Sequence, residues 1–186
     1  MIAQNQKKNS ILIFDANIFF IGIDFNVIPQ KIYTTPKILE ELKVEKYASH
    51  NRNIINRVNV AINRGNLIIR EPTYTYLNQV KISSHKTGDI GALSKADQEL
   101  IALALEFKNL FDDDVIIYSN DYSIQNCCKE LKIHYESLMK RGIRRKIVFE
   151  VYCPNCKIIY DADKLNEICE ICGSRLRRRP VSKNDI

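Results

Sequence analysis

Two pairs of cysteines near the C-terminal end constrain the fold of this chain more than any other feature. The segments CPNC and CEIC, separated by twelve residues, contain Cys153, Cys156, Cys169 and Cys172. Within each pair, two thiolates and nearby backbone N–H groups can wrap one side of a metal ion. Two such pairs complete a tetrahedral site of four sulfur atoms with no open position. The sequence therefore predicts a structural zinc ribbon.

The predicted ribbon is too small to fold around an apolar core of its own, so metal binding and folding should be one event. Gly173 directly follows the second pair and permits the turn that such a site needs. A redox dithiol pair and an iron–sulfur cluster are the alternatives, but neither explains two matched pairs in so short and basic a segment. Cys127 and Cys128 lie in a predicted helix, and we interpret them as ordinary buried thiols.

The net charge of +6 lies entirely in the last quarter of the chain. Residues 1–139 contain 16 Lys and Arg and 16 Asp and Glu, whereas residues 140–186 contain 12 and 6. Basic charge gathered in a small unit favours a polyanionic partner, above all nucleic acid. A solvated tail explains the same charge equally well.

The remaining composition indicates a folded, cytoplasmic protein. With 186 residues, 45% of them apolar, the chain has room for one medium domain and a small appendage. No stretch approaches the roughly 20 apolar residues of a membrane span. The first ten residues, MIAQNQKKNS, lack the apolar core of a signal peptide, so we expect no membrane association and reduced cysteines.

Short apolar runs alternate with longer amphipathic ones before the cysteine pairs. ILIF (11–14) and VIIY (115–118) are continuous and β-branched, as in central strands that are covered on both faces. Residues 66–69 and 132–135 are weaker strand candidates. This alternation predicts an α/β domain with a mostly parallel central sheet. Helices are expected at about 36–48, 51–64, 73–84 and 94–109.

The chain divides into three parts by composition. We expect the α/β domain over 1–139, a basic linker or hinge over 140–150, and the ribbon with a basic tail over 151–186. The segment IVFEVY (147–152) is predicted to lead into the ribbon as a strand. Residues 83–94, with two glycines, are predicted to form a surface loop.

Two carboxylates follow the two strongest strands. Asp15 ends the first strand and Asp121 comes shortly after VIIY, each before a helical stretch. The carboxyl edge of an open parallel sheet is where ligands bind. For either residue alone, an N-cap is the more common role, and Ser123 competes with Asp121 for that position.

Two further carboxylates lie on predicted helices. Asp97 has the spacing of a capping box with Ser94, but it also shares the apolar face of its helix with Leu100. In PKILEEL, Glu41 lies at the border of the apolar stripe and Glu40 lies nearly opposite it, so we choose Glu41 and interpret Glu40 as a surface charge. Four carboxylates that converge on one edge would repel one another unless a cation such as Mg²⁺ or Mn²⁺ neutralised them.

These acids and their surroundings resemble the acidic quartet of PIN-domain nucleases. The ribbon that follows is similar to that of the Nin-one-binding endonuclease family of small ribosomal subunit maturation, in its compact archaeal form. KTGD (86–89) and YSIQN (122–126) look like local signatures of that family. The resemblance covers nearly the whole chain, from about Ser10 to Arg178, and it implies a PIN-like three-layer fold.

The resemblance implies a metal-dependent endoribonuclease that cuts precursor small-subunit rRNA, within the pre-ribosomal small subunit, to form its mature 3′ end. Asp15, Glu41, Asp97 and Asp121 would then be the catalytic acids that bind Mg²⁺ or Mn²⁺. Ser119 would be a supporting hydroxyl, and Asn120 stands where related members often have another acid. The residues expected to hold RNA phosphates are Lys140, Arg141, Arg144, Arg145, Arg175, Arg177, Arg178 and Arg179.

Three other functions are compatible with parts of this pattern. A non-catalytic RNA-binding assembly factor would keep the fold without the chemistry, although all four acids are present. A toxin-type ribonuclease acting on tRNA or mRNA would usually lack a ribbon. A phosphatase with an Asp nucleophile needs a second acid two residues later, where this chain has Asn17. Tyr152 and Tyr160 could stack on bases, but burial within the ribbon is the favoured role.

Overall fold

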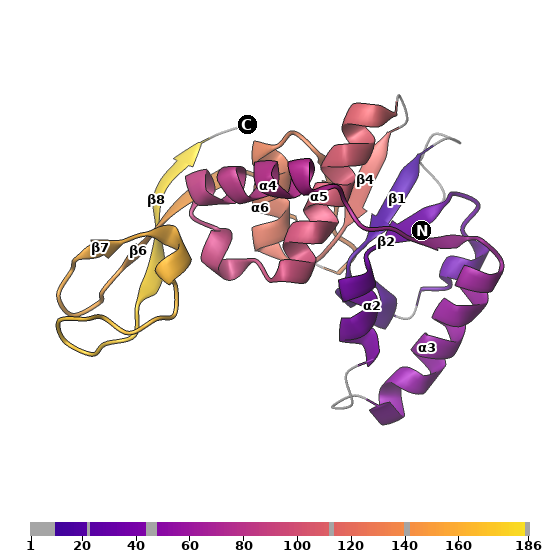
Figure 1. Cartoon of the computed structure of the whole chain (residues 1–186), viewed down its shortest axis with the longest axis horizontal. Helices are drawn as coiled ribbons and strands as arrows, with labels where there is room; N and C mark the ends of the chain where they lie inside the picture. Colours follow the sequence, from indigo (N-terminus) through magenta and orange to yellow (C-terminus); the bar gives the residue numbers. More distant parts are fainter. Residues whose placement is uncertain (1–9, 22, 44–47, 112–113, 140–141, 185–186) are drawn as a thin grey trace.

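The computed structural model describes residues 10–21, 23–43, 48–111, 114–139 and 142–184. Figure 1 shows a larger α/β part that contains most of the helices and a smaller part, formed around a second sheet, at one end of the molecule. None of the helices in the described ranges is both long enough and apolar enough to cross a membrane.

A five-stranded sheet forms the centre of the larger part. Its strands are arranged in the order β3-β2-β1-β4-β5, and every neighbouring pair is parallel. The chain order reverses between β1 and β4, and ligands bind beside such a switch point in open sheets. The strands are β1 (Ile11–Phe14), β2 (Ile32–Thr34), β3 (Leu67–Ile69), β4 (Val115–Tyr118) and β5 (His134–Glu136).

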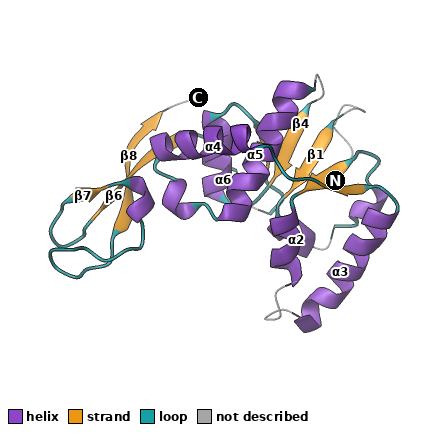
Figure 2. Ribbon diagram, viewed as in Figure 1, coloured by secondary structure: helices purple, strands orange, loops and turns teal. Residues whose placement is uncertain are grey.

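Helices flank this sheet (Figure 2). Two of the helices begin directly after a central strand or shortly after it, α1 behind β1 and α6 behind β4. The α/β class, the mostly parallel sheet and the four expected strands are confirmed, but β2 was not predicted. The helices are α1 (Ala16–Phe20), α2 (Pro36–Lys43), α3 (Ala48–Asn63), α4 (Tyr74–Thr87), α5 (Lys95–Leu110) and α6 (Tyr122–Glu130).

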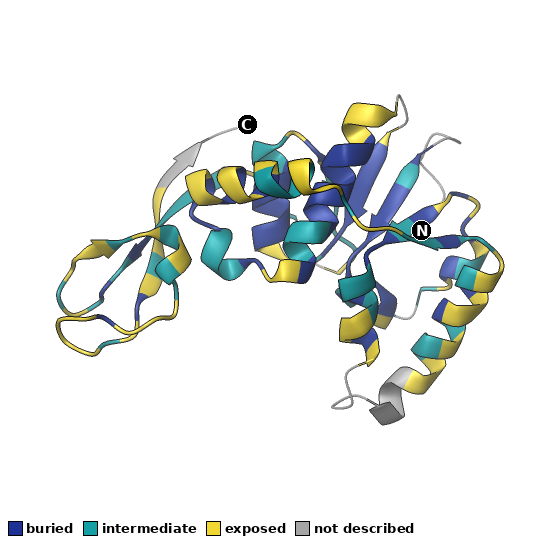
Figure 3. Ribbon diagram, in the orientation of Figure 1, coloured by how far each residue is buried: buried dark blue, intermediate teal, exposed yellow. Residues whose placement is uncertain are grey.

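The apolar runs that predicted β1 and β4 lie in the core. All four residues of β4 are buried, and Leu12, Ile13 and Phe14 of β1 are fully inaccessible. The ring of Phe14 makes edge contacts with Tyr118, at 5.4 Å between centroids, and with Phe19. Each such side chain contributes about 1.5–3 kcal/mol when it is removed from water. Figure 3 shows this buried centre in dark blue.

The prediction of a surface loop over 83–94 is wrong. Helix α4 continues to Thr87, and Ser84, Thr87 and Asp89 are buried. Gly88 ends the helix in the left-handed conformation, with φ of 74°, and the Asp89 N–H donates to the carbonyl oxygen of Ser84 at 2.9 Å. Ser84, Thr87 and Asp89 are polar but can be buried because their side chains are hydrogen-bonded.

A second, antiparallel sheet carries the cysteine pairs, in the order β7-β6-β8. Its strands are β6 (Lys146–Tyr152), β7 (Ile159–Tyr160) and β8 (Arg177–Asn184). Strand β6 contains the expected strand 147–152 and starts within the segment 140–150, where it pairs with β8. A separate small core lies here, made of Val151, Cys153, Cys169 and Leu176.

Candidate functional site

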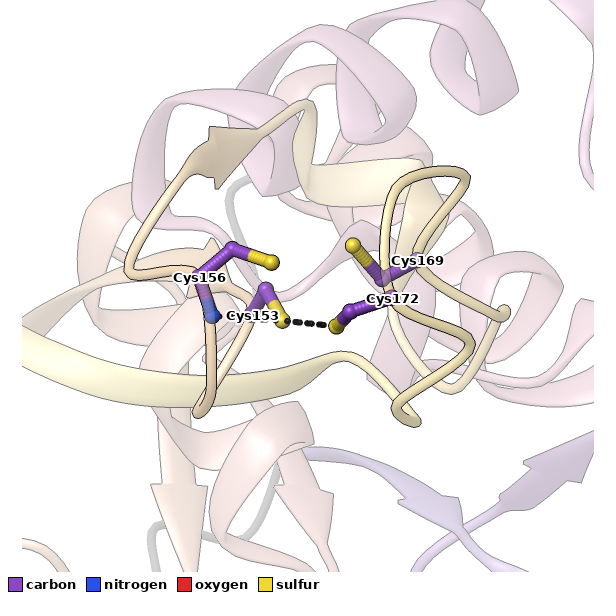
Figure 4. Close-up of side chains that lie close together, drawn as sticks. All are labelled: Cys153, Cys156, Cys169 and Cys172. Carbon is purple, nitrogen blue, oxygen red and sulfur yellow. Dashed lines mark hydrogen bonds between the residues drawn. The ribbon is translucent and has the colours of Figure 1, made fainter.

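The four cysteines of the two pairs form one cluster. Their sulfur atoms all lie within 4.8 Å of one another, and Figure 4 shows the two pairs facing each other. Cys153 and Cys169 are buried. The predicted convergence of the four thiols is confirmed, and the cluster is compatible with a zinc ribbon.

Matched turns hold the two pairs. In each pair the residue after the second cysteine has a positive φ: 64° at Lys157 and 72° at Gly173. The N–H of each of these residues donates to the carbonyl oxygen of the first cysteine of its pair, at 2.9 Å in both cases. These turns direct both thiols of a pair to the same side of the chain. The hydroxyl of Tyr160 lies 3.1 Å from the sulfur of Cys169, so this ring packs within the ribbon, as expected.

The donor atoms suit a structural metal. The side chain and backbone of Ser174 hold the pKa of Cys172 at about 5, well below its usual value. This shift favours the thiolate of Cys172, which is the form that binds metal. Four soft sulfur donors that face one another leave no position for substrate, and this arrangement fits zinc better than a harder cation.

Asp15 lies at the carboxyl end of β1, beside the switch point of the sheet. It is the N-cap of α1, and its side chain is only 4% exposed. One carboxylate oxygen accepts from the Ala16 N–H at 2.6 Å, and the other accepts from the Ser119 hydroxyl at 2.6 Å. The pKa of Asp15 is raised from 3.8 to about 7, chiefly by burial and also by the charges of Asp97 and Asp121, which together outweigh the hydrogen bonds from Ser119 and Ala16.

The hydroxyl of Ser119 joins two of the predicted acids. It donates to Asp15 and accepts from the backbone N–H of Asp121 at 3.0 Å. Asn17 completes this group: its amide nitrogen donates to Asp15, and its amide oxygen accepts from the Asn120 N–H at 3.2 Å. From the sequence, Ser119 was expected to support the acids, whereas no role was predicted for Asn17. The one feature that could have indicated a role for Asn17 is its position two residues after Asp15.

Asp121 is the N-cap of α6, and its carboxylate accepts from the Ser123 N–H at 2.6 Å. Asp97 is half-buried in a complete capping box, in which the Ser94 N–H donates to its carboxylate at 2.8 Å. The structural roles that the sequence left open for Asp15, Asp97 and Asp121 are therefore all present. A carboxylate oxygen that accepts one hydrogen bond still has a second lone pair for a cation.

Electrostatic interactions connect the four acids. Burial and then the charge of Asp121 raise the pKa of Asp97. Glu41 is exposed on α2, and partial burial together with the charge of Asp97 raises its pKa. Glu40 is also exposed, as expected of a surface charge. The negative charges therefore act on one another across β1, α2, α5 and α6.

The acids are arranged less tightly than the sulfur atoms. Within the described part of the chain, they do not form a group as close as the four cysteines, and none of them makes an ion pair with Lys or Arg. Negative charge without a basic partner, carried by hard oxygen atoms, fits a divalent cation such as Mg²⁺ or Mn²⁺.

Asn120 has a structural role here. Its side-chain oxygen accepts from the Ser137 hydroxyl at 2.8 Å and from the N–H groups of Leu138 and Met139 at 3.1 Å. The amide thereby fixes the chain that leaves β5.

The predicted RNA-contacting residues have different surroundings. Arg144, Arg145, Arg175 and Arg177 are exposed, whereas Lys140 and Arg141 lie outside the described residues. Arg179 is exposed but pairs with Glu150 at 2.6 Å. Arg178 is half-buried and pairs with the buried Asp89 at 2.9 Å, so its guanidinium has a structural partner.

Comparisons with known proteins agree with this geometry. Residues 12–107 match the family described as the PIN domain of ribonuclease. The chain is 32% identical to Endoribonuclease Nob1 of Methanocaldococcus jannaschii, over 92% of this chain and 78% of that protein. It is also 32% identical to Endoribonuclease Nob1 of Pyrococcus abyssi, over 91% of this chain and 93% of that protein.

A more limited similarity connects the chain to another group of ribonucleases. Ribonuclease VapC1 of Thermoplasma acidophilum is 31% identical over 59% of this chain and 53% of that protein. The two Nob1 relatives named above match over about nine-tenths of the chain. The parallel sheet, the acids at its carboxyl edge and these similarities together lead to one assignment. This chain belongs to the Nob1 family of PIN-domain endoribonucleases.

Proposed function

We propose that this endoribonuclease cleaves precursor small-subunit rRNA to form the mature 3′ end, acting within the pre-ribosomal small subunit. The observation that carries the proposal is the mutual electrostatic interaction of four acids at the carboxyl edge of the sheet, without a basic partner among the described residues. The family name supports the choice of substrate, because the relatives that match most of the chain are named Endoribonuclease Nob1.

Asp15, Glu41, Asp97 and Asp121 are the proposed ligands of Mg²⁺ or Mn²⁺. Burial at the switch point lets Asp15 act in a medium of low polarity, where its charge interacts strongly with a cation. Ser119 orients Asp15 and the start of α6 at the same time. When bound, a divalent ion would polarise a water molecule and neutralise charge on the phosphate that is cut.

The second part of the proposal concerns the architecture. Residues 1–139 form the nuclease domain, 140–150 connect it to the ribbon, and 151–186 form the zinc ribbon with its basic tail. The exposed arginines of the connection and the ribbon contact RNA phosphates. Such contacts predict an RNA affinity that falls steeply as salt rises, because each contact releases counterions.

Cleavage of a defined RNA tests the proposal. The substrate is an RNA that spans the 3′ end of precursor small-subunit rRNA, incubated with the full chain and Mn²⁺. Asp15→Asn should lower the rate by more than about 100-fold, because even a residue that only supports a metal ligand is worth 10- to 100-fold.

Asp24→Asn is the matched control, since Asp24 is also an N-cap acid but is exposed and belongs to a short helix away from the edge. It should cleave as the wild type does. Equal rates for Asp15→Asn and the wild type would contradict the metal site. Preferential cleavage of tRNA over the rRNA fragment would instead favour a toxin-type ribonuclease.

A further inference from the structure

A cavity of about 640 Å³ lies where α6 meets the second sheet. Its lining comes from five places in the chain: Asp89, α6, residues 142–145, β6 and β8. The volume is within the range of small-molecule sites in proteins, about 300–1,000 Å³. None of the four proposed metal-binding acids is among the residues that line the cavity.

Hydrogen bonds between the two parts of the molecule build one wall of the cavity. The amide of Asn126 donates to the Ile147 carbonyl oxygen at 2.7 Å and accepts from the Ile147 N–H at 2.9 Å. α6 is thereby joined to β6 through both polar backbone groups of one residue. Breaking either hydrogen bond between Asn126 and Ile147 would leave a buried polar atom without a partner, so these bonds hold α6 and β6 together at the cavity wall.

A second set of contacts fixes the guanidinium of Arg178. It donates to the fully buried carboxylate of Asp89 at 2.9 Å and to the Ser123 hydroxyl at 3.2 Å. The same guanidinium lies over the ring of Phe149, at 4.4 Å from the centroid. Asp89 in turn accepts from Asn126 at 2.6 Å. One face of the cavity is therefore preformed: the Arg178 guanidinium is held over the Phe149 ring, and Asp89 balances its charge.

The remaining lining is exposed and suits a nucleotide. Tyr122, the first residue of α6, is 49% exposed, and the exposed Arg144 carries a positive charge in the connecting segment. A base offers a flat face that stacks on aromatic rings and on guanidinium planes, and its phosphate pairs with arginine. The combination of tyrosine, phenylalanine and arginine around one cavity matches both halves of a nucleotide.

The cavity is adjacent to one of the proposed catalytic acids. Tyr122 directly follows Asp121 in the chain, and Ser123, also in the lining, donates its N–H to the Asp121 carboxylate at 2.6 Å. We propose that this cavity binds one unpaired nucleotide of the RNA strand that is cut, with its base against Tyr122 and its phosphate near Arg144. This inference rests on the proposed function, because the four acids determine which strand is cut. It requires the RNA to be single-stranded where the nucleotide enters the cavity.

Binding of a short labelled RNA to the full chain tests the proposal. Fluorescence anisotropy is measured without added Mg²⁺ or Mn²⁺ and without chelator, so that no strand is cut and the ribbon metal stays in place. Tyr122→Ala should weaken the binding of single-stranded RNA by about 5-fold or more, the usual effect of one stacked base. Tyr122→Phe should bind as the wild type does, and Arg144→Ala should weaken binding.

Two matched control variants distinguish a loss of RNA binding at the cavity from a general loss of RNA affinity. Tyr74 is also the first residue of a helix and is 71% exposed, but it does not line the cavity. Arg64 is exposed and directly follows α3, at the opposite end of the molecule from the second sheet (Figure 1). Tyr74→Ala and Arg64→Ala should both bind as the wild type does.

The same RNA annealed to its complement gives the decisive comparison. Its bases are paired, so Tyr122→Ala should bind the duplex as the wild type does. Equal binding of single strands by Tyr122→Ala and Tyr74→Ala would overturn the proposal, and so would an equal loss on single strand and duplex. Because no cleavage is measured, a failure of the acid assignment would appear in the Asp15→Asn rates and would leave this result unchanged.

Discussion

At the scale of single residues, Asp15 shows how a buried carboxylate is maintained. Its place beside the switch point removes it from water, and two hydrogen bonds recover only part of the lost hydration. The folded protein therefore holds its proton up to about pH 7, whereas the unfolded chain releases it near pH 3.8. A cation that binds at this edge would replace the proton.

This difference predicts a pH-dependent stability. Below about pH 4 the Asp15 carboxyl is neutral in both the folded and the unfolded protein, so its burial does not lower the free energy of unfolding. As pH rises towards the folded pKa of about 7, only the unfolded chain ionises, so the folded protein loses stability, by up to about 4 kcal/mol for a shift of this size. Without added Mg²⁺ or Mn²⁺, Asp15→Asn should therefore be more stable than the wild type at pH 8 and equal to it at pH 4.

Urea denaturation at a series of pH values measures the effect. Saturating Mn²⁺ is the internal control, because it should restore stability to the wild type at pH 8 and leave Asp15→Asn unchanged. A constant difference between the two proteins from pH 4 to 8 would show that Asp15 is ionised throughout and that burial does not raise its pKa.

At the scale of elements, the end of α4 and the middle of β6 approach each other closely. A side chain at Gly88 would place its Cβ 2.0 Å from the Phe149 carbonyl oxygen, and one at Gly91 would place it 2.7 Å from that of Ala162. KTGD therefore lies at the contact between the nuclease domain and the second sheet, and so does Asn126 of YSIQN. The two segments KTGD and YSIQN therefore meet at this junction.

Gly88→Ala should accordingly destabilise the protein more than an ordinary glycine substitution. Gly65 is the matched control: its φ of 70° is close to the 74° of Gly88, but nothing lies within 4 Å of an added Cβ. Both variants have the cost of a left-handed alanine, about 1 kcal/mol. Only Gly88→Ala must also separate α4 from β6, so urea denaturation should show a further loss of about 1–3 kcal/mol. Equal losses of stability in the two variants would mean that α4 and β6 can move apart without a free-energy cost, which would contradict the prediction.

At the scale of the whole molecule, two cores of different size are joined. The main core surrounds the parallel sheet, whereas the second consists of four buried residues, two of which are cysteines of the cluster. So small a core cannot offset the conformational entropy of its segment without the metal. Stability of the ribbon should therefore depend on the metal, and that of the nuclease domain should not.

Removal of the metal tests this division. Metal analysis should give about one zinc per chain, and chelation should abolish the hydrogen-exchange protection of β7 and the cysteine turns while β1 and β4 stay protected. Cys172→Ser should behave as the chelated protein does. Cys127→Ala is the control, because Cys127 is a buried thiol of α6 outside the cluster, and it should keep its zinc. Full protection of a metal-free ribbon would contradict the proposed zinc site.

The sequence by itself determined the features that depend on local patterns. Continuous apolar runs predicted the central strands β1 and β4, and the matched spacing of the cysteines predicted their cluster, because both signals lie within a few residues of chain. The ends of strands also indicated Asp15 and Asp121 as candidate acids, since the carboxyl ends of parallel strands share one edge.

Only the tertiary structure decided what the polar segments do. Residues 83–94 have the composition of a surface loop, yet Asp89 is fully buried because Arg178, far along the chain, supplies its counter-charge. No local pattern reports such a pairing, since each residue alone resembles an ordinary surface group. The junction, the cavity beside Tyr122 and the bridge through Ser119 all depend on contacts of this kind, whose partners folding brings together from distant parts of the chain.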